Sequence, residues 1–66
     1  MDLIVNGELR TLSGPASVAD LVRELTDRLT GVAVAVNGAV VPRSAWAATS
    51  LNKGDAIEIL TAVQGG

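Results

Sequence analysis

The sequence has no cysteine and no histidine among its 66 residues, and Trp46 is its only aromatic side chain. The first two absences exclude disulfides, Cys/His metal sites, cysteine nucleophiles and histidine general bases. The five basic residues are scattered, and a single aromatic ring offers no stacking platform, so nucleic-acid binding is not expected. Chemistry in this chain must therefore come from other groups.

Long apolar runs are also missing, and the first residues do not have the cationic and apolar pattern expected of a signal peptide. Asn6-Gly7 interrupts the first apolar run at once, and the uncharged stretch 29–42 is too short to cross a bilayer. What is present is a 48% hydrophobic composition built from aliphatic residues, with a net charge of −2. We therefore expect one small cytoplasmic domain with a thin core and no membrane partner.

The first third of the chain predicts a hairpin. Residues 3–5 and 8–12 flank Asn6-Gly7, a strong signal for a two-residue turn. The second of these segments alternates polar and apolar residues, which predicts a half-buried return strand.

A helix is predicted to begin at Ser17. Ser17 and Asp20 have the spacing of a capping box, and Gly31 is expected to stop the helix. An i, i+4 ion pair is expected between Glu24 and Arg28. The apolar stripe expected to face the core comprises Val18, Leu21, Val22, Leu25 and Leu29.

The second half predicts three more strands. Residues 32–36 are expected to form an interior strand with its valines toward the helix. Asn37-Gly38 predicts a hairpin turn into a short strand over residues 39–41. Pro42 is expected to end that strand because it lacks an N–H donor. Residues 44–51 are expected to be irregular or one helical turn anchored by Trp46. After a turn over 52–55, residues 56–62 form the last strand, with either Ile57/Ile59 or Leu60/Ala62 packed under the helix.

This order, ββαβββ, places a helix crossover before the last strand. Such a strand can pair parallel to the first, with the usual right-handed crossover. We therefore predict an α+β β-grasp (ubiquitin-like) domain over residues 1–62, a small mixed sheet on one helix, followed by a flexible Gly-Gly tail over 63–66.

No catalytic or cofactor site is expected within this domain. The seven acidic residues fall on turns, strand exteriors or the polar helix face and are interpreted as solvated charge, and no glycine-rich phosphate loop is present. No metal is expected. Arg43 either contacts a partner's carboxylate or holds its own loop through a local ion pair, and we prefer the structural role.

The tail is the remaining candidate. Val63, Gln64, Gly65 and Gly66 follow the last strand, and about four extended residues reach roughly 13–14 Å. Glycine has no Cβ, so a Gly-Gly end can thread a narrow channel and leaves its terminal carbonyl uncrowded. The tail is therefore either a reactive carboxylate on a delivery arm or an ordinary frayed terminus.

The whole chain resembles the ThiS family, the sulfur carrier proteins of thiamine biosynthesis. The resemblance rests on the order of elements, on Gly54-Asp55 before the last strand, and on Gly65-Gly66 at the end. It also rests on Asn37-Gly38 and on Val41-Pro42-Arg43 with Trp46 three residues later. Gln64 departs from the small or apolar residue often found before the glycines, which bears on fit to a partner channel.

The resemblance implies a protein co-substrate that is not itself an enzyme. An E1-like adenylyltransferase (ThiF-type) would adenylate the Gly66 carboxylate using Mg-ATP. Sulfur supplied by a cysteine desulfurase or sulfurtransferase would make a thiocarboxylate, which serves a thiazole synthase (ThiG-type). Docking is expected to use the tail and the sheet face away from the helix, with Ile59, Leu60 and Arg43 as candidate contacts.

Three alternatives stay open on the sequence. The first is a carrier for molybdopterin or another thiocarboxylate-dependent pathway. The second is a β-grasp module that binds without covalent chemistry, and the third is a protein modifier that forms isopeptide bonds.

Overall fold

The computed structural model of the chain describes residues 1–26 and 30–61. The predicted order of strands and helix is confirmed within these residues. Of the two alternatives for residues 44–51, the helical one is confirmed, as a 3-10 helix that contains Trp46. The elements are β1 (Asp2–Val5), β2 (Glu8–Thr11), α1 (Val18–Leu25), β3 (Val32–Val36), β4 (Ala39–Val41), η1 (Arg43–Ala48) and β5 (Ala56–Thr61).

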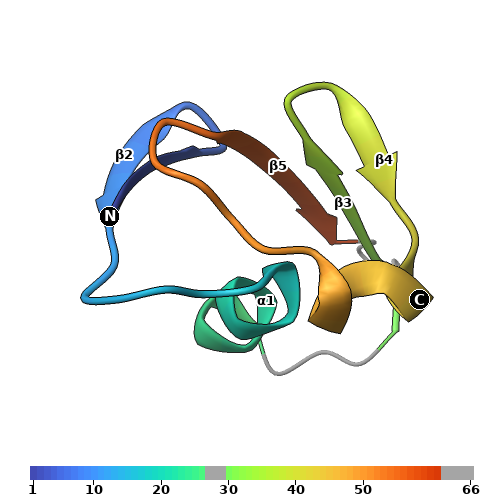
Figure 1. Cartoon of the computed structure of the whole chain (residues 1–66). Coiled ribbons are helices and arrows are strands. Elements are labelled where there is room, and N and C mark those ends of the chain that lie inside the picture. Colours follow the sequence, from blue (N-terminus) through green and yellow to red (C-terminus); the bar gives the residue numbers. More distant parts are fainter. Residues whose placement is uncertain (27–29, 62–66) are drawn as a thin grey trace.

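The strands form a mixed sheet in the order β2-β1-β5-β3-β4, and α1 packs against one face of it (Figure 1). β5 lies parallel to β1 and antiparallel to β3, so the predicted parallel pairing of the first and last strands is confirmed. This arrangement is the α+β β-grasp fold that the order of elements predicts. It puts β5 at the centre of the sheet.

Both Asn-Gly turns form the predicted hairpins. Asn6 and Asn37 each have a φ of 51°, and the following glycines have φ of 81° and 84°, values that glycine adopts without strain. Each asparagine side chain also reaches β5. The Asn6 Oδ1 accepts from the Ile59 N–H at 2.8 Å, and the Asn37 Oδ1 accepts from the Ala56 N–H at 2.9 Å. The turns therefore fasten the last strand as well as reversing the chain.

The predicted capping box starts α1. The Ser17 Oγ accepts from the Asp20 N–H at 3.2 Å, and an Asp20 carboxylate oxygen accepts from the Ser17 N–H at 2.9 Å. The predicted stop at Gly31 is wrong. The helix ends at Leu25 because Thr26, a β-branched residue with low helix propensity, adopts an extended backbone with φ −155° and ψ 147°.

Part of the helix prediction falls outside the described residues. Leu29 and Arg28 lie there, so the expected ion pair between Glu24 and Arg28 stays a prediction. Of the described stripe, Val18, Leu21 and Val22 are buried and Leu25 is partly buried.

The core lies between α1 and the helix-facing side of the sheet. Trp46 closes one end, as predicted: it is 8% exposed, and its Nε1 donates to the Val41 carbonyl at 2.9 Å. The valine face of β3 also points inward, as predicted, with Val34 only 2% exposed. The buried apolar residues are Leu3, Val5, Leu12, Val18, Leu21, Val22, Val34, Trp46, Leu51, Ile57 and Ile59.

The prediction that β2 is half-buried is wrong. All four of its residues are exposed. The register pairs Leu9 with Ile4, which turns Leu9 away from the helix, and pairs Arg10 with buried Leu3. The apolar position of the strand therefore lies on the solvent side, and the charged positions lie on the side of the core.

The cap of α1 predicts a specific dependence of stability on pH. The pKa of Asp20 lies below its ordinary value of 3.8, because its carboxylate accepts from the Ser17 backbone N–H and hydroxyl and lies beside Arg23. The ionised form is thus favoured by folding, and this stabilisation is present above the unfolded pKa and lost as pH falls through the lower folded pKa. In urea unfolding at pH 7, 4 and 2, Asp20→Asn should be less stable than wild type at pH 7, with the difference in unfolding free energy narrowing as pH falls toward 2.

The matched control is Glu8→Gln, an exposed position on β2, away from the capping box. It should follow the wild-type pH profile. A gap between wild type and Asp20→Asn that stays constant down to pH 2 would contradict the assignment.

Candidate functional site

The predicted reactive tail lies outside the described residues. This applies to Val63, Gln64, Gly65 and Gly66, so their roles stay predictions, and the domain boundary after residue 62 does too. The structure describes the chain up to Thr61, which pairs with Val32 of β3. The tail therefore follows directly from the central strand of the sheet.

The described residues contain no assembled catalytic cluster. No group of three or more acidic side chains among them lies close enough to hold a metal ion. The ion pair that the structure records in residues 1–26 and 30–61 joins Arg23 to Asp20 on the exposed surface of α1. Also within these residues, no helix is long and apolar enough to cross a membrane.

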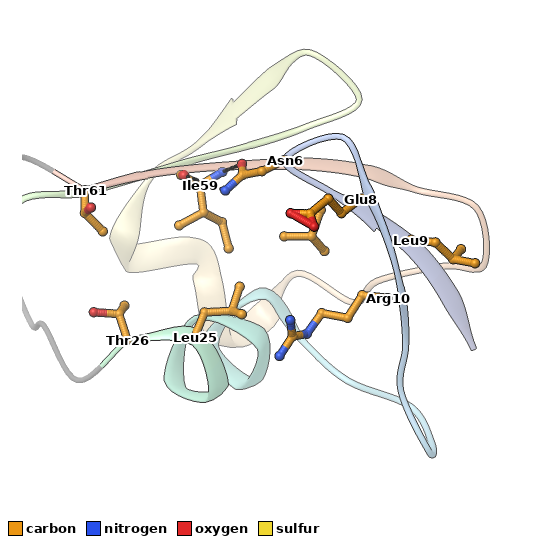
Figure 2. A pocket seen from close by; sticks show the side chains of 9 residues that line it. Asn6, Glu8, Leu9, Arg10, Leu25, Thr26, Ile59 and Thr61 are labelled. Carbon is orange, nitrogen blue, oxygen red and sulfur yellow. Dashed lines mark hydrogen bonds between the residues drawn. The ribbon is translucent and has the colours of Figure 1, made fainter.

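A cleft of about 330 Å³ lies between β2, the second half of β5 and the end of α1 (Figure 2). Figure 2 shows Arg10 reaching from β2 toward the helix, while Ile59 points from β5 toward Leu25. Glu8 also lines the cleft, and the Asn6 side chain in its wall already bonds the Ile59 backbone. A single carboxylate and a single guanidinium, each exposed, do not make an acid–base pair of the kind that catalysis needs.

The sheet face turned away from α1, here the outer face, is a more distinctive feature. The four large hydrophobic residues that are exposed in the described chain all lie on it: Ile4 (43%), Leu9 (72%), Val40 (78%) and Leu60 (66%). The register assembles them, because Ile4 pairs with Leu9 and Ala56, Ala35 with Glu58 and Val40, and Ala33 with Leu60. Grouped exposed apolar side chains of this kind commonly mark interaction sites.

The structure separates the two β5 residues predicted to dock. Ile59 is 7% exposed and packs in the core with Ile57, so its side chain is not available to a partner. Successive strand residues point to opposite faces, and Leu60 is accordingly on the outer face. Of the two alternatives for packing under the helix, the Ile57/Ile59 set is confirmed.

Arg43, the third predicted contact, lies in η1 after β4. Its guanidinium carbon is 5.6 Å from the centroid of the Trp46 ring, a cation–π contact. The local ion pair expected for Arg43 is absent among the described residues, where no carboxylate pairs with it. The contact therefore joins two residues of η1, and the Arg43 side chain remains exposed.

Sequence reasoning missed most of the outer face. Glu58 is exposed, as its interpretation as solvated charge requires, and the register places it on β5 at the middle of this face, opposite Ala35. Alternation along β5 was the available signal, since it puts Glu58 and Leu60 on the same side. What the sequence did not provide was the identity of the neighbours across the strands.

A sequence profile of the ThiS family matches residues 3–66, nearly the whole chain. This chain belongs to the ThiS family. It is 30% identical to the sulfur carrier protein ThiS of Escherichia coli K12 over 66 residues, which cover all of both chains.

Two further comparisons bear on fold and partner. The crystal structure of a thiamine biosynthesis protein (ThiS) from Geobacter metallireducens superposes with a TM-score of 0.84 at 38% identity and covers all of both chains. The chain is also 39% identical over its full length to part of a thiazole synthase from Paramagnetospirillum magneticum, and it spans 20% of that relative's length. A ThiS-like sequence thus occurs within a thiazole synthase polypeptide.

Proposed function

We propose that this chain is a sulfur carrier protein of thiamine biosynthesis and that the Gly66 carboxylate carries the sulfur. The observation that supports this most directly is the extent of the family match, which runs through Gly66 and so includes the Gly-Gly tail. Full-length similarity to the sulfur carrier of Escherichia coli supports the same role. In this proposal the protein is a co-substrate, and enzymes that bind it provide the catalysis.

Activation is needed because a carboxylate is a poor acyl donor. In the proposed first step, a Gly66 carboxylate oxygen attacks the α-phosphorus of Mg-ATP on an E1-like (ThiF-type) adenylyltransferase, and pyrophosphate leaves. The resulting acyl-adenylate has AMP as a good leaving group. Because this step consumes ATP, we place the carrier in the cytoplasm.

Sulfur enters in the second step. The terminal sulfur of a persulfide, formed by a cysteine desulfurase or sulfurtransferase, attacks the Gly66 carbonyl carbon and displaces AMP. A second thiol then attacks the inner, cysteine-derived sulfur of this acyl disulfide and breaks the S–S bond. The thiocarboxylate leaves with the terminal sulfur, and the donor cysteine and the second thiol end as a disulfide. The thiocarboxylate is a good nucleophile, and we propose that a ThiG-type thiazole synthase uses it.

In this proposal the domain positions the Gly66 carboxylate at the partner's reacting centre. Val63, Gln64 and Gly65 act as the delivery arm, attached to β5, which is paired on both sides. We propose that the outer face, with Leu60 exposed on it, docks against the partner while the arm reaches the reacting centre. The thiazole synthase of Paramagnetospirillum magneticum, which contains a similar sequence, favours the thiazole pathway over a molybdopterin pathway.

Intact mass spectrometry tests the proposal. After incubation with Mg-ATP, the cognate adenylyltransferase and a persulfide donor, the protein should gain the mass of one sulfur in exchange for one oxygen, and fragmentation should locate the change at Gly66. Omitting ATP is the control and should prevent the change. An unchanged mass with partners that load another carrier would favour a binding module, and an isopeptide-linked product would favour a protein modifier.

A further inference from the structure

Among the residues that the structure describes, those of the outer face carry charge of one sign only. Its strand positions include two acidic residues, Glu58 and Asp2, and the Asp2 carboxylate already accepts from the Thr11 hydroxyl at 2.8 Å. The Glu58 side chain is exposed and has no ion pair among the described residues. Glu58 is therefore the free charge at the middle of an apolar surface.

The described cations all lie elsewhere. Arg10 pairs with Leu3 and so points to the helix side of the sheet, and Arg23 lies on α1. Arg43 stacks on Trp46 in η1, and Lys53 lies in the turn before β5. No described strand position of the outer face supplies a cation for Glu58.

Two hollows flank Glu58. One of about 120 Å³ is lined by Ala33, Ala35 and Val40, and another of about 540 Å³ is lined by Ile4, Gly7 and Ala56. Glu58 and Leu60 line both, so they form a ridge between them. The small side chains of the alanines leave room there for apolar groups of a partner.

This pattern disfavours a second copy of the chain as the occupant. In a two-fold symmetric dimer the same patch meets itself, so the two Glu58 carboxylates at its middle would face each other in a desolvated contact. Like charges placed together in an interface are strongly unfavourable. The occupant must instead offer a positive charge between apolar side chains.

We propose that Glu58 determines partner specificity, by pairing with a lysine or arginine of thiazole synthase that lies between two apolar side chains seated in the hollows. This rests on the proposed function for the choice of partner, because a similar sequence occurs within a thiazole synthase polypeptide. The apolar contacts provide attraction of low selectivity, and the desolvated charge pair rejects surfaces without a matching cation.

The test is titration calorimetry of the chain with its cognate thiazole synthase. Glu58→Lys should raise Kd at least about tenfold, and Glu58→Gln should raise it about three- to tenfold while flattening its dependence on salt between 50 and 300 mM. Glu24→Lys makes the same charge change on α1, away from the outer face, and should stay within about twofold of wild type. Circular dichroism confirms that each variant is folded.

Leu60→Asp separates this inference from the docking surface itself. If Leu60→Asp weakens binding while both Glu58 variants bind like wild type, the outer face is the docking site and the charge pairing is wrong. Equal losses of affinity in Glu58→Lys and Glu24→Lys would mean that only the net charge of the chain matters, and would also overturn the proposed pairing. The pairing would also be overturned if the wild-type chain did not bind thiazole synthase. The same holds if the wild-type chain formed a homodimer that Leu60→Asp dissociates. None of these outcomes depends on sulfur loading of Gly66, which mass spectrometry tests independently.

Discussion

Deleting Gly66 is expected to abolish sulfur loading while leaving the domain folded. The shortened chain still ends in a glycine carboxylate, that of Gly65, so the deletion changes reach rather than chemical type. One residue of extended chain is about 3.5 Å, and misplacement of a reacting group by about 1 Å can cost a factor of about 100 in rate. Loading measured by intact mass should fall at least about a hundredfold, with the urea midpoint unchanged.

A C-terminal amide on the full-length chain is the matched control. It keeps the length of the arm and removes the carboxylate, so it should also block loading. The deletion thus tests the length of the tail with a carboxylate still present, and the amide tests the carboxylate at unchanged length. Loading of the deletion variant at the wild-type rate would contradict the proposed role of Gly66, and loss of the fold in that variant would contradict a tail that is separate from the domain.

Leu21→Ala is expected to have the largest effect on stability. Leu21 is fully buried in the middle of α1, between the helix and the sheet, and alanine is itself a good helix former, so the loss is one of packing. Buried Leu→Ala changes cost about 2–5 kcal/mol, whereas a domain of this length has roughly 3–10 kcal/mol in total. Thermal denaturation followed by circular dichroism should show a fall in Tm of roughly 10–30 °C.

Leu9→Ala is the matched control for this prediction. The chemical change is the same, but Leu9 is 72% exposed on the edge strand β2. Its unfolding free energy should change by less than about 1 kcal/mol. Similar losses at the two positions would contradict the assignment of the core.

Features encoded by neighbouring residues were predictable from the sequence. The two Asn-Gly turns, the capping box of Ser17 and Asp20, and the end of β4 at Pro42 each depend on backbone conformations that a few adjacent residues specify. The end of α1 was mispredicted because Gly31 is a common stop signal, whereas Thr26 leaves the helix earlier. A helix boundary is a balance between weak local preferences, and a distant glycine does not set it.

The tail chemistry was approached mainly by exclusion. Without cysteine or histidine in the chain, the Gly66 carboxylate was the group left to propose, and the family match then included it. The structure shows that β5, the last strand before the tail in the sequence, is the central one of the sheet.

By itself, the sequence determined the order of elements, the turns and the chemistry that the chain cannot perform. Only the tertiary structure decided which face each strand residue occupies. Alternation shows that Ile59 and Leu60 point in opposite directions, but which of them meets the helix depends on the pairing of β5 with β1 and β3, from distant parts of the chain. The same pairing buries Ile59, exposes Leu60 and Leu9, and places Glu58 in the middle of an apolar face.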